Sequence, residues 1–367
     1  MSSPEACLNA RATLQEIQTL KGRFDIAFDQ AATSAHEKDI LEAQKVKREL
    51  EDKMKRFREL VDKLKLERLV KDAAKLYEDG LKLRLRESGS TETISINPDH
   101  VRLPENLTPE HLEAVKEALG GRGLEERILP TLQDLNHLND AYINAMYPAT
   151  QSEADTKRGL KAYRPSPWAW DQTVSVEGTF KTNDTWGKVY VGSMREELKN
   201  LGGSLVLLDT ATKPNYTDGS QNYGSVEGKD PKADPLLPLF QEAFGKDASR
   251  FYRTWREIEA KLLPLAKKKI QESFASRGLE ETDFEVMLVP AVLDNQEMTL
   301  KNPESSSTNT WDWTSTPLLD DKGTDTGRRL SVGSSEDGGA GGVIDAGRGL
   351  RDDNLGARLA VIFKKHD

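Results

Sequence analysis

The side chains that most often carry enzyme chemistry are few in this chain and are not grouped along it. The sequence of 367 residues holds one cysteine, Cys7, and five histidines. The histidines are His36, His100, His111, His137 and His366. A single cysteine excludes an intrachain disulfide and a cysteine-rich metal centre, and no two histidines have zinc-ligand spacing. We therefore expect neither a metal centre nor a cofactor.

Acidic and hydroxyl side chains gather instead in a polar stretch near the C-terminus. Its acids are Asp320, Asp321, Asp325, Glu336, Asp337, Asp345, Asp352 and Asp353. Calcium needs such oxygen ligands, but their spacing does not match an EF-hand, so solvated loop acids are favoured and calcium is the alternative. Ser331, Ser334 and Ser335 have no histidine near them before His366. A Ser–His nucleophile is therefore unsupported, and we expect these serines to be surface polar groups in a protein that is not an enzyme.

Strand-like pieces flank this stretch and would position it. Their alternating apolar residues are Trp311, Trp313, Leu330, Val332, Leu359, Val361 and Phe363. Alternation places one face of a strand in the core, so we expect all seven to be buried. Between them, residues 334–353 offer only Val343, Ile344 and Leu350 as apolar anchors. This segment cannot form a core and should lie across the surface, where a rigid scaffold commonly holds binding residues.

The N-terminal quarter has the composition of long helices, which we expect over residues 13–85. Between Glu37 and Gly80 there is no Gly or Pro. Apolar residues there follow alternating steps of three and four, with Lys47 as the exception: Ile40, Ala43, Leu50, Met54, Phe57, Val61 and Leu64. This heptad pattern favours an antiparallel hairpin that folds back on residues 8–33. A coiled coil that self-associates through residues 37–80 is the alternative.

A linker-like segment, Gly89–Pro98, leads to a second helical module. We expect one helix at Thr108–Gly121, with Pro109 at its first position, and another at Ile128–Tyr147. Beyond Pro148 aromatic residues and glycine increase. The expected domains are therefore 1–88, 89–159 and 160–367.

The last domain mixes strand and helix patterns, which predicts an α+β fold class. Strands are expected at Lys188–Gly192, Ser204–Asp209, Glu285–Leu293 (interrupted by Pro290) and Ala357–Phe363. Helices are expected at Met194–Leu201, Leu236–Phe244 and Thr254–Phe274, and a long loop at Asn215–Asp234. We expect Trp168, Trp170 and Trp186 in the core, with stacking on a sugar as the alternative.

The overall charge restricts the classes of partner. A net charge of -9 disfavours nucleic acid, which would be repelled on average. The N-terminus has no signal-peptide h-region, and no stretch approaches the ~18 apolar residues of a membrane span. These features predict a cytoplasmic protein without a membrane span.

The order of short motifs in the C-terminal region resembles a known family. The motifs are the W-x-W of Trp311–Trp313, the R-L-x-V-G of Arg329–Gly333, a pair of adjacent glycines, and the L-G-x-R-L of Leu355–Leu359. They resemble the C-terminal half of formylglycine-generating-enzyme (sulfatase-modifying factor) domains, a branch of the C-type-lectin fold. More closely, they resemble the variable proteins of diversity-generating retroelements, in which error-prone copying at adenines diversifies a ligand-binding surface. The resemblance covers about Trp311–Phe363.

The resemblance implies a helical N-terminal region followed by a C-type-lectin-fold domain whose hypervariable segment lies at about 331–353. The implied ligand-binding residues are Ser331, Ser334, Ser335, Asp337, Ala340, Gly341, Ile344, Asp345, Ala346, Gly347, Arg348, Gly349, Arg351 and Asp352. Arg348 and Arg351 would anchor a protein or other macromolecular ligand, because arginine is frequent at interface hot spots. Asp345 and Asp352 would add charge selectivity.

The genetic code offers a check on this resemblance. Adenine randomisation of an AAC codon cannot produce Glu, Lys, Gln, Met or Trp. Within Ser334–Asp353, Glu336 is the only residue of these types. Two alternatives remain: a non-diversified structural or interaction protein of the same fold, and a formylglycine-generating-type enzyme. The second lacks the cysteine pair of that chemistry, since Cys7 stands alone in the helical region.

Overall fold

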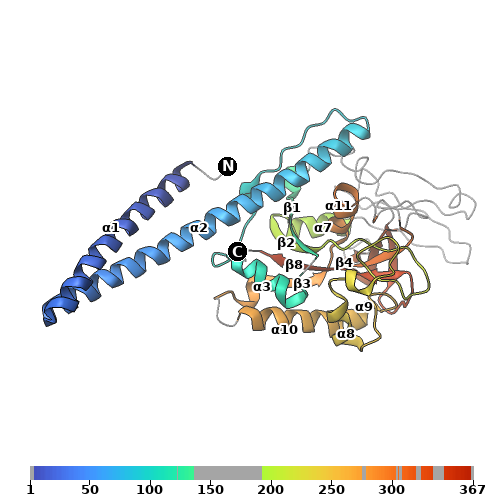
Figure 1. Ribbon diagram of the computed structural model, residues 1–367. Helices are drawn as coiled ribbons and strands as arrows, with labels where there is room; N and C mark the ends of the chain where they lie inside the picture. The colour runs from blue at the N-terminus through green and yellow to red at the C-terminus, as the bar shows by residue number, and fades with distance from the viewer. Residues whose placement is uncertain are drawn as a thin grey trace, which may run out of the picture. The chain divides into compact units, whose positions relative to one another are not determined.

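The computed structural model describes residues 4–121, 123–135, 192–274, 278–302, 305, 308–319, 324–333 and 343–364 (Figure 1). The chain divides into two compact units, Met1–Asp72 and Ala73–Asp367. The boundary falls inside a long helix, whose last turns belong to the second unit. A helical N-terminal region followed by a sheet-rich region confirms the predicted α+β class.

The first unit is an antiparallel helical hairpin, as the heptad pattern predicts. Its helices are α1 (Pro4–Ser34) and the first part of α2 (Glu37–Glu87). The chain reverses at Ala35, which has a φ of 47°. The ion pairs Glu16–Lys53 and Arg23–Glu49 join residues whose numbers run in opposite directions, which is the signature of antiparallel helices.

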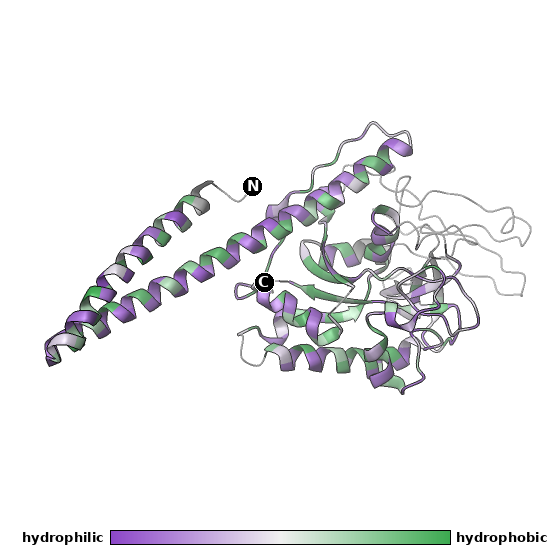
Figure 2. Cartoon of the chain, viewed as in Figure 1, coloured by the Kyte–Doolittle hydropathy of each residue, from purple (hydrophilic) through white to green (hydrophobic). Residues whose placement is uncertain are grey.

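The face that α2 turns toward α1 differs in part from the predicted seam. Ala43 and Val46 are buried, whereas Ile40 and Met54 are exposed by 42% and 38%. The prediction was therefore wrong for Ile40 and Met54. Val46 takes the core position that the predicted pattern had given to Lys47, so no lysine is needed in the seam there. Apolar and polar residues alternate along both helices in Figure 2, as expected for a two-helix contact.

The second unit contains two four-stranded sheets. The first has the order β1-β2-β8-β3, and all its neighbours are antiparallel. Its strands are β1 (Leu124–Leu129), β2 (Ser204–Asp209), β3 (Phe284–Leu288) and β8 (Leu359–Phe363). Every residue of β2 and β8 is buried, so both faces of this sheet are covered. Such strands read as continuous apolar runs in the sequence.

The second sheet has the order β6-β5-β4-β7, with β4 and β7 parallel and the other pairs antiparallel. Its strands are β4 (Trp311–Leu319), β5 (Asp325–Val332), β6 (Val343–Gly347) and β7 (Leu355–Ala357). Only Arg358 separates β7 from β8. The chain therefore passes from the second sheet into the first at this one residue.

Helices cover the sheets on both sides. They are α3 (Pro109–Leu119), α4 (Leu132–Leu135), α7 (Gly192–Leu201), α8 (Leu237–Phe244), α9 (Trp255–Glu257), α10 (Leu263–Phe274) and α11 (Ala291–Leu300). A π-helical turn, η5 (Ile258–Leu262), joins α9 to α10, and short 3-10 turns lie at Pro98–His100, Pro231–Ala233 and Glu281–Asp283. In the view of Figure 1, α10 lies below β3 and β8, and α7 and α11, which contact β4, lie on the other side of β8. Phe274 of α10 meets Phe284 of β3 edge-on at 5.4 Å.

Several element predictions are confirmed. Strand β2, helices α7 and α8, and the helical stretch from Trp255 to Phe274 lie where the patterns place them. The seven alternating residues of the C-terminal strands are all buried, from 0% for Trp313 to 6% for Trp311.

Two element predictions are wrong in part. Ile128 and Leu129 end strand β1 instead of beginning a helix, because they pair with β2 at Leu205 and Ser204. The predicted strand Glu285–Leu293 ends at Leu288, and α11 begins after Pro290. Proline lacks an N–H and has a φ suited to a helix start, so the chain turns into a helix there.

Some predictions lie outside the described residues. These are Trp168, Trp170, Trp186, residues 136–147 of the predicted second helix, and residues 188–191 of the predicted strand Lys188–Gly192, whose Gly192 begins α7. The linker-like segment Gly89–Pro98 has no helix or strand before Pro98, yet its Ile94 and Ile96 are buried.

Candidate ligand-binding surface

Several large apolar side chains of the second unit are exposed, and three of them come from separate sequence segments that meet near residues 350–353. Among the unit's described residues, five such side chains are exposed: Leu76, Leu83, Tyr216, Tyr252 and Leu350. The last three lie around residues 350–353. We call the surface formed by Tyr216, Asp218, Tyr252, Arg253, Arg256 and residues 348–353 the tyrosine–arginine surface.

Tyr252 forms one end of this surface. The residue is 50% exposed and its φ is 60°, a left-handed conformation that is uncommon for a residue with a Cβ. Its N–H donates to the carbonyl of Asp352 at 3.1 Å. The guanidinium of Arg351 lies 5.3 Å from the ring centre and donates to Glu257 at 2.6 Å. Tyr252 is thus held outward and bears a cation on its ring.

Tyr216 forms the other end. The residue is 39% exposed, and its hydroxyl donates to the carboxylate of Asp353 at 2.9 Å. The Tyr216 N–H donates to the side chain of Asn309 at 2.7 Å. Buried Gln221 donates to the carbonyl of Asp353 at 2.9 Å and accepts from the N–H of Gly219 at 2.9 Å. The loop that carries Tyr216 is therefore tied to residues 352–353.

A buried ion cluster around Arg250 fixes the chain segment that carries Tyr252. Arg250 is fully buried and donates to Asp209 and to both carboxylate oxygens of Asp234, with its Nε at 2.8 and 2.9 Å from the latter. Its guanidinium lies 4.4 Å above the ring of Tyr223, which stacks on Phe251 at 5.3 Å. Residues 250 and 251 are thus fixed in the core, and Tyr252 is the next residue outward.

A second ion cluster lies where the two sheets meet. Arg358 pairs with Asp312 of β4 at 3.4 Å and with Asp294 of α11 at 3.6 Å, and all three are buried. The hydroxyl of Tyr223 donates to Asp312, which links this cluster to the stack below Tyr252. Lys213 is also buried and donates to the carbonyl of Thr310 at 2.7 Å.

Burial sets the protonation of this second cluster. It raises the pKa of Asp294, and the neighbouring Asp312 carboxylate raises that pKa further. It lowers the pKa of Lys213, against the attraction of Asp312 and Asp294. Burial alone would also lower the pKa of Arg358, but the same two carboxylates outweigh it and keep the guanidinium charged. The side chains of the cluster are buried, and its ion pairs hold β4, α11 and the residue between β7 and β8 together.

Two tryptophans tie the second sheet to the chain around Tyr252. The indole of Trp313 donates to the carbonyl of Arg253 at 2.9 Å. The indole of Trp255 donates to the carbonyl of Thr314 at 3.0 Å, and the guanidinium of Arg329 lies 4.5 Å from its ring. These contacts fix residues 253–255 on strand β4.

The close packing below the surface requires glycine at position 356. A Cβ there would lie 2.8 Å from Cε1 of Phe251 and would also overlap the Tyr223 hydroxyl. Real Cβ contacts are not that short, so any larger residue would displace the Tyr223–Phe251 stack. The glycine of the L-G-x-R-L motif therefore has a packing role.

The predicted site residues are divided between surface, core and the parts outside the described residues. Gly349 and Arg351 are exposed, and Gly347, Arg348 and Asp352 are half-buried. Ile344 and Asp345 lie in β6, paired with Ser331 and Leu330. Ser334, Ser335, Asp337, Ala340 and Gly341 lie outside the described residues.

Three predictions within this segment are wrong. Ser331 is fully buried and Ala346 is 3% exposed, although both were expected at the surface. Leu350, expected as an apolar anchor, is 44% exposed. The reason is that residues 343–347 form a strand against β5 and do not cross the surface as an irregular loop. Among the residues of this segment whose burial is described, 347–353 reach solvent in part or in full.

Sequence reasoning missed Tyr216, Tyr252 and the buried ions. Tyr216 and Tyr252 lie far from residues 348–353 in the sequence and meet them only through long-range contacts. The buried ions had a local signal: Asp312 stands between two tryptophans, and Arg358 interrupts an otherwise apolar run. A charge inside an apolar strand pattern indicates a buried, paired ion.

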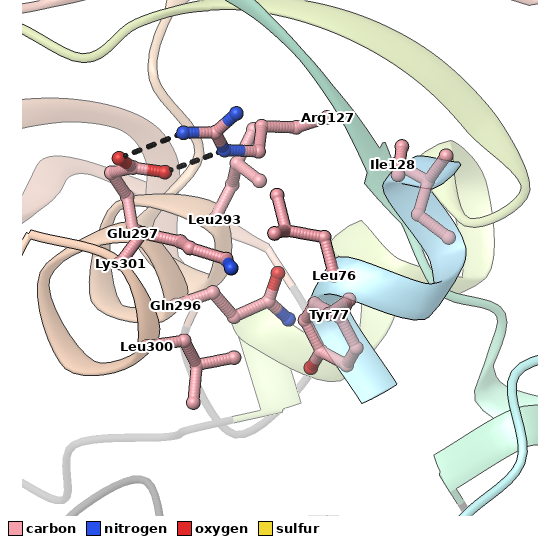
Figure 3. A pocket seen from close by; sticks show the side chains of 10 residues that line it. Leu76, Tyr77, Arg127, Ile128, Leu293, Gln296, Glu297, Leu300 and Lys301 are labelled. Atoms are coloured by element: carbon pink, nitrogen blue, oxygen red, sulfur yellow. Dashed lines mark hydrogen bonds and ion pairs between the residues drawn. The ribbon is translucent and has the colours of Figure 1, made fainter. Parts of the chain in front are cut away.

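Two other kinds of site find little support in the described residues. A cavity of about 20 Å³ lies between the last turns of α2, β1 and α11, beside the Arg127–Glu297 pair whose nitrogen–oxygen distances are 2.8 and 3.1 Å (Figure 3). Its volume is enough for about one water molecule. No three His, Cys, Asp or Glu side chains are placed to hold a metal ion in the parts of the chain that the structure describes. Nor is any helix there long and apolar enough to cross a membrane.

Comparison of the chain with protein-family models, curated proteins and solved structures finds no match.

Proposed function

We propose that this chain is a recognition protein that binds a protein or other macromolecular ligand through the tyrosine–arginine surface, without turnover. The observation that carries the proposal is that two exposed tyrosines meet one exposed segment: Tyr252 lies against Arg351 and Tyr216 bonds to Asp353, with exposed Leu350 in the same segment. Tyrosine and arginine are enriched at interface hot spots. These anchors come from three separate segments that buried contacts hold in place, and such preorganisation lowers the entropic cost of binding.

The sequence resemblance supports the same proposal. Its motifs supply Trp311, Trp313, Gly356 and Arg358, the residues that fix the chain beneath the surface. A C-type-lectin-type scaffold with a diversified segment at its surface is accordingly the fold and origin that we propose. In this reading, the helical hairpin serves as a mount, or as a self-association element that adds avidity. A non-diversified interaction protein would use the same surface.

The absence of turnover is proposed from the placement of titratable groups. Among the described residues, Asp209, Lys213, Asp294 and Asp312 are fully buried. A substrate has no access to them. On the tyrosine–arginine surface, Arg351 is paired with Glu257 and the Tyr216 hydroxyl with Asp353, which is an arrangement for binding.

The proposal is tested by exchanging residues 348–353 for other sequences while keeping β6 and Leu355 onward. Binding of each variant to one panel of candidate proteins is then measured, with thermal melts as the folding control. We expect the melts to stay close to the parent chain and the binding profile to change. A matched control exchanges Lys268 and Glu272, an exposed pair on α10, and should leave the profile unchanged. Identical profiles for all 348–353 variants would place recognition elsewhere.

A further inference from the structure

The charges on the tyrosine–arginine surface are separated into two ends. Beside Tyr252 lies Arg351, and the segments that carry these two residues also carry Arg253, Arg256 and Arg348, with Glu257 as their acidic neighbour. Arg351 is near enough to Arg253 to lower the pKa of that guanidinium, although burial lowers it more. The N–H of Arg256 donates to the carbonyl of Arg348 at 3.2 Å, which joins the two segments. Four cations against two carboxylates, Glu257 and the Asp325 that interacts with Arg348, leave this end basic.

The end around Tyr216 is acidic. The hydrogen bond to Asp353 raises the pKa of the Tyr216 phenol, and the charges of Asp353, Asp218 and Asp352 raise it too. Asp218 is held by its bond from the N–H of Ser220 at 3.0 Å. Three carboxylates therefore surround one exposed ring.

The two ends are fixed relative to each other by short contacts. Residues 351–353 run from Arg351, beside Tyr252, to Asp353, beside Tyr216. Two steps along an extended chain span at most about 7 Å. Ser249, just before Arg250, donates to the carbonyl of Gly219 at 3.3 Å, which joins the Tyr252 segment to the acidic loop. The charge separation is therefore a rigid feature of the surface.

We infer that the ligand is a polypeptide segment with an acidic end and a basic end, docked in one fixed direction with its acidic end on the Tyr252 side. This inference rests on the proposed function and adds the chemistry of the partner. A nucleic acid fits poorly, because a uniformly anionic polymer would place charge against Asp218, Asp352 and Asp353. Complementary charge sets orientation and excludes wrong partners more than it adds affinity. The exposed rings and Leu350 supply the apolar contact.

The test is selection from a random 12-residue peptide display library on the full chain. Selected peptides are then synthesised in forward and reversed order, so that composition and net charge are identical. We expect enriched peptides to carry acidic and basic residues in a constant order. The forward peptide should bind at least about tenfold more tightly than the reversed one. A 20-nucleotide oligothymidylate should not compete at physiological salt.

Variants that remove the charges from one end of the surface at a time test the contribution of each end to peptide binding. Arg256→Gln with Arg351→Gln, and separately Asp352→Asn with Asp353→Asn, should each weaken the forward peptide roughly threefold to tenfold. Asparagine keeps the acceptor oxygens used by Tyr216 and Asn354. The matched control Lys268→Gln removes an exposed cation from α10 and should change nothing.

Equal binding of forward and reversed peptides, competition by oligothymidylate, or an equal loss in the control would overturn the inference. Peptides that need Tyr216 and Tyr252 but show no charge order would overturn it while leaving the proposed function standing. Failure to enrich any peptide that depends on these tyrosines would count against both.

Discussion

The two sheets of the second unit differ in the chemistry of the side chains that their strands bury. The first is largely apolar: Leu205–Leu208 of β2 and all of β8 are buried without a charged side chain, and Asp209, which pairs with Arg250 at the end of β2, is the exception. The second buries Asp312, Thr314, Thr316 and Ser331 among its tryptophans. Aliphatic packing is non-directional, whereas buried ions and hydrogen bonds demand defined partners at defined positions. The first sheet mainly supplies stability, and the second mainly fixes where particular residues lie.

This difference bears on the candidate site. The tyrosine–arginine surface is attached to the polar sheet, through Trp313 and Trp255, and to the ion clusters around Tyr223. Replacement of a buried ion should therefore cost stability and also disturb the surface, while loss of an aliphatic contact should cost stability alone.

The largest effect is expected from Arg358→Met. It leaves Asp312 and Asp294 buried without their counter-ion, and breaking such a pair costs about 3–5 kcal/mol. Denaturant unfolding measures this loss, with Arg68→Met on the exposed hairpin as a control within about ±0.5 kcal/mol. A loss below about 1 kcal/mol would contradict the view that the polar sheet depends on this ion.

Leu207→Ala probes the aliphatic sheet. Leu207 is fully buried between β1 and β8, and truncating a buried leucine costs roughly 2–5 kcal/mol. The loss should be similar at pH 5 and pH 8, because the substitution removes only apolar atoms and Glu126, opposite Leu207 in β1, is ion-paired with Lys116 at 2.6 Å. Peptide binding by the folded variant should be unchanged. A strongly pH-dependent loss would argue against an apolar interior.

Glu197→Gln tests a buried carboxyl group beside the second sheet through the pH dependence of the unfolding free energy. Burial raises the pKa of Glu197 to about 7, although Thr316 of β4 donates to it at 2.6 Å. The folded state therefore binds this proton more tightly than the unfolded state, so stability falls as pH rises from about 4.5 to about 7. The raised pKa corresponds to about 3 kcal/mol at most. The raised pKa of buried Asp294 likewise makes the folded state less stable as pH rises.

Unfolding free energies of the parent and the Glu197→Gln variant, measured from pH 4.5 to 8, test this expectation. The variant should show a flatter profile across this window. Parallel profiles would mean that Glu197 is not buried as a proton-binding group.

The smallest effect is expected from Ser331→Ala. The Ser331 hydroxyl is buried without a hydrogen-bond partner among the described residues. Removing an unsatisfied hydroxyl is nearly neutral or slightly stabilising, within about 1 kcal/mol. Ligand binding should not change, because the side chain does not reach the surface. A loss of binding with intact stability would restore Ser331 to the site.

Parts of the fold that depend on local pattern were predictable. Periodicity predicted the hairpin, β2, α7 and α8. It also predicted the burial of the seven alternating apolar residues between Trp311 and Phe363. The predictions failed where tertiary pairing overrode local signals. Residues 343–347 look like a glycine-rich loop, yet β5 offers them a complete ladder of hydrogen bonds. Ser331 and Ala346 are buried for that reason, although their types suit a surface.

The sequence by itself determined the α+β class, the helical hairpin and the apolar strands, because each depends on the spacing of apolar residues along one segment. It also indicated residues 334–353 as a surface segment, part of which the structure places in strand β6. Only the tertiary structure decided that Tyr216 and Tyr252 flank this segment and that the charges around it separate into two ends. Those features join residues more than 90 positions apart, as in the Tyr216–Asp353 bond, and no local pattern encodes which distant side chains will meet.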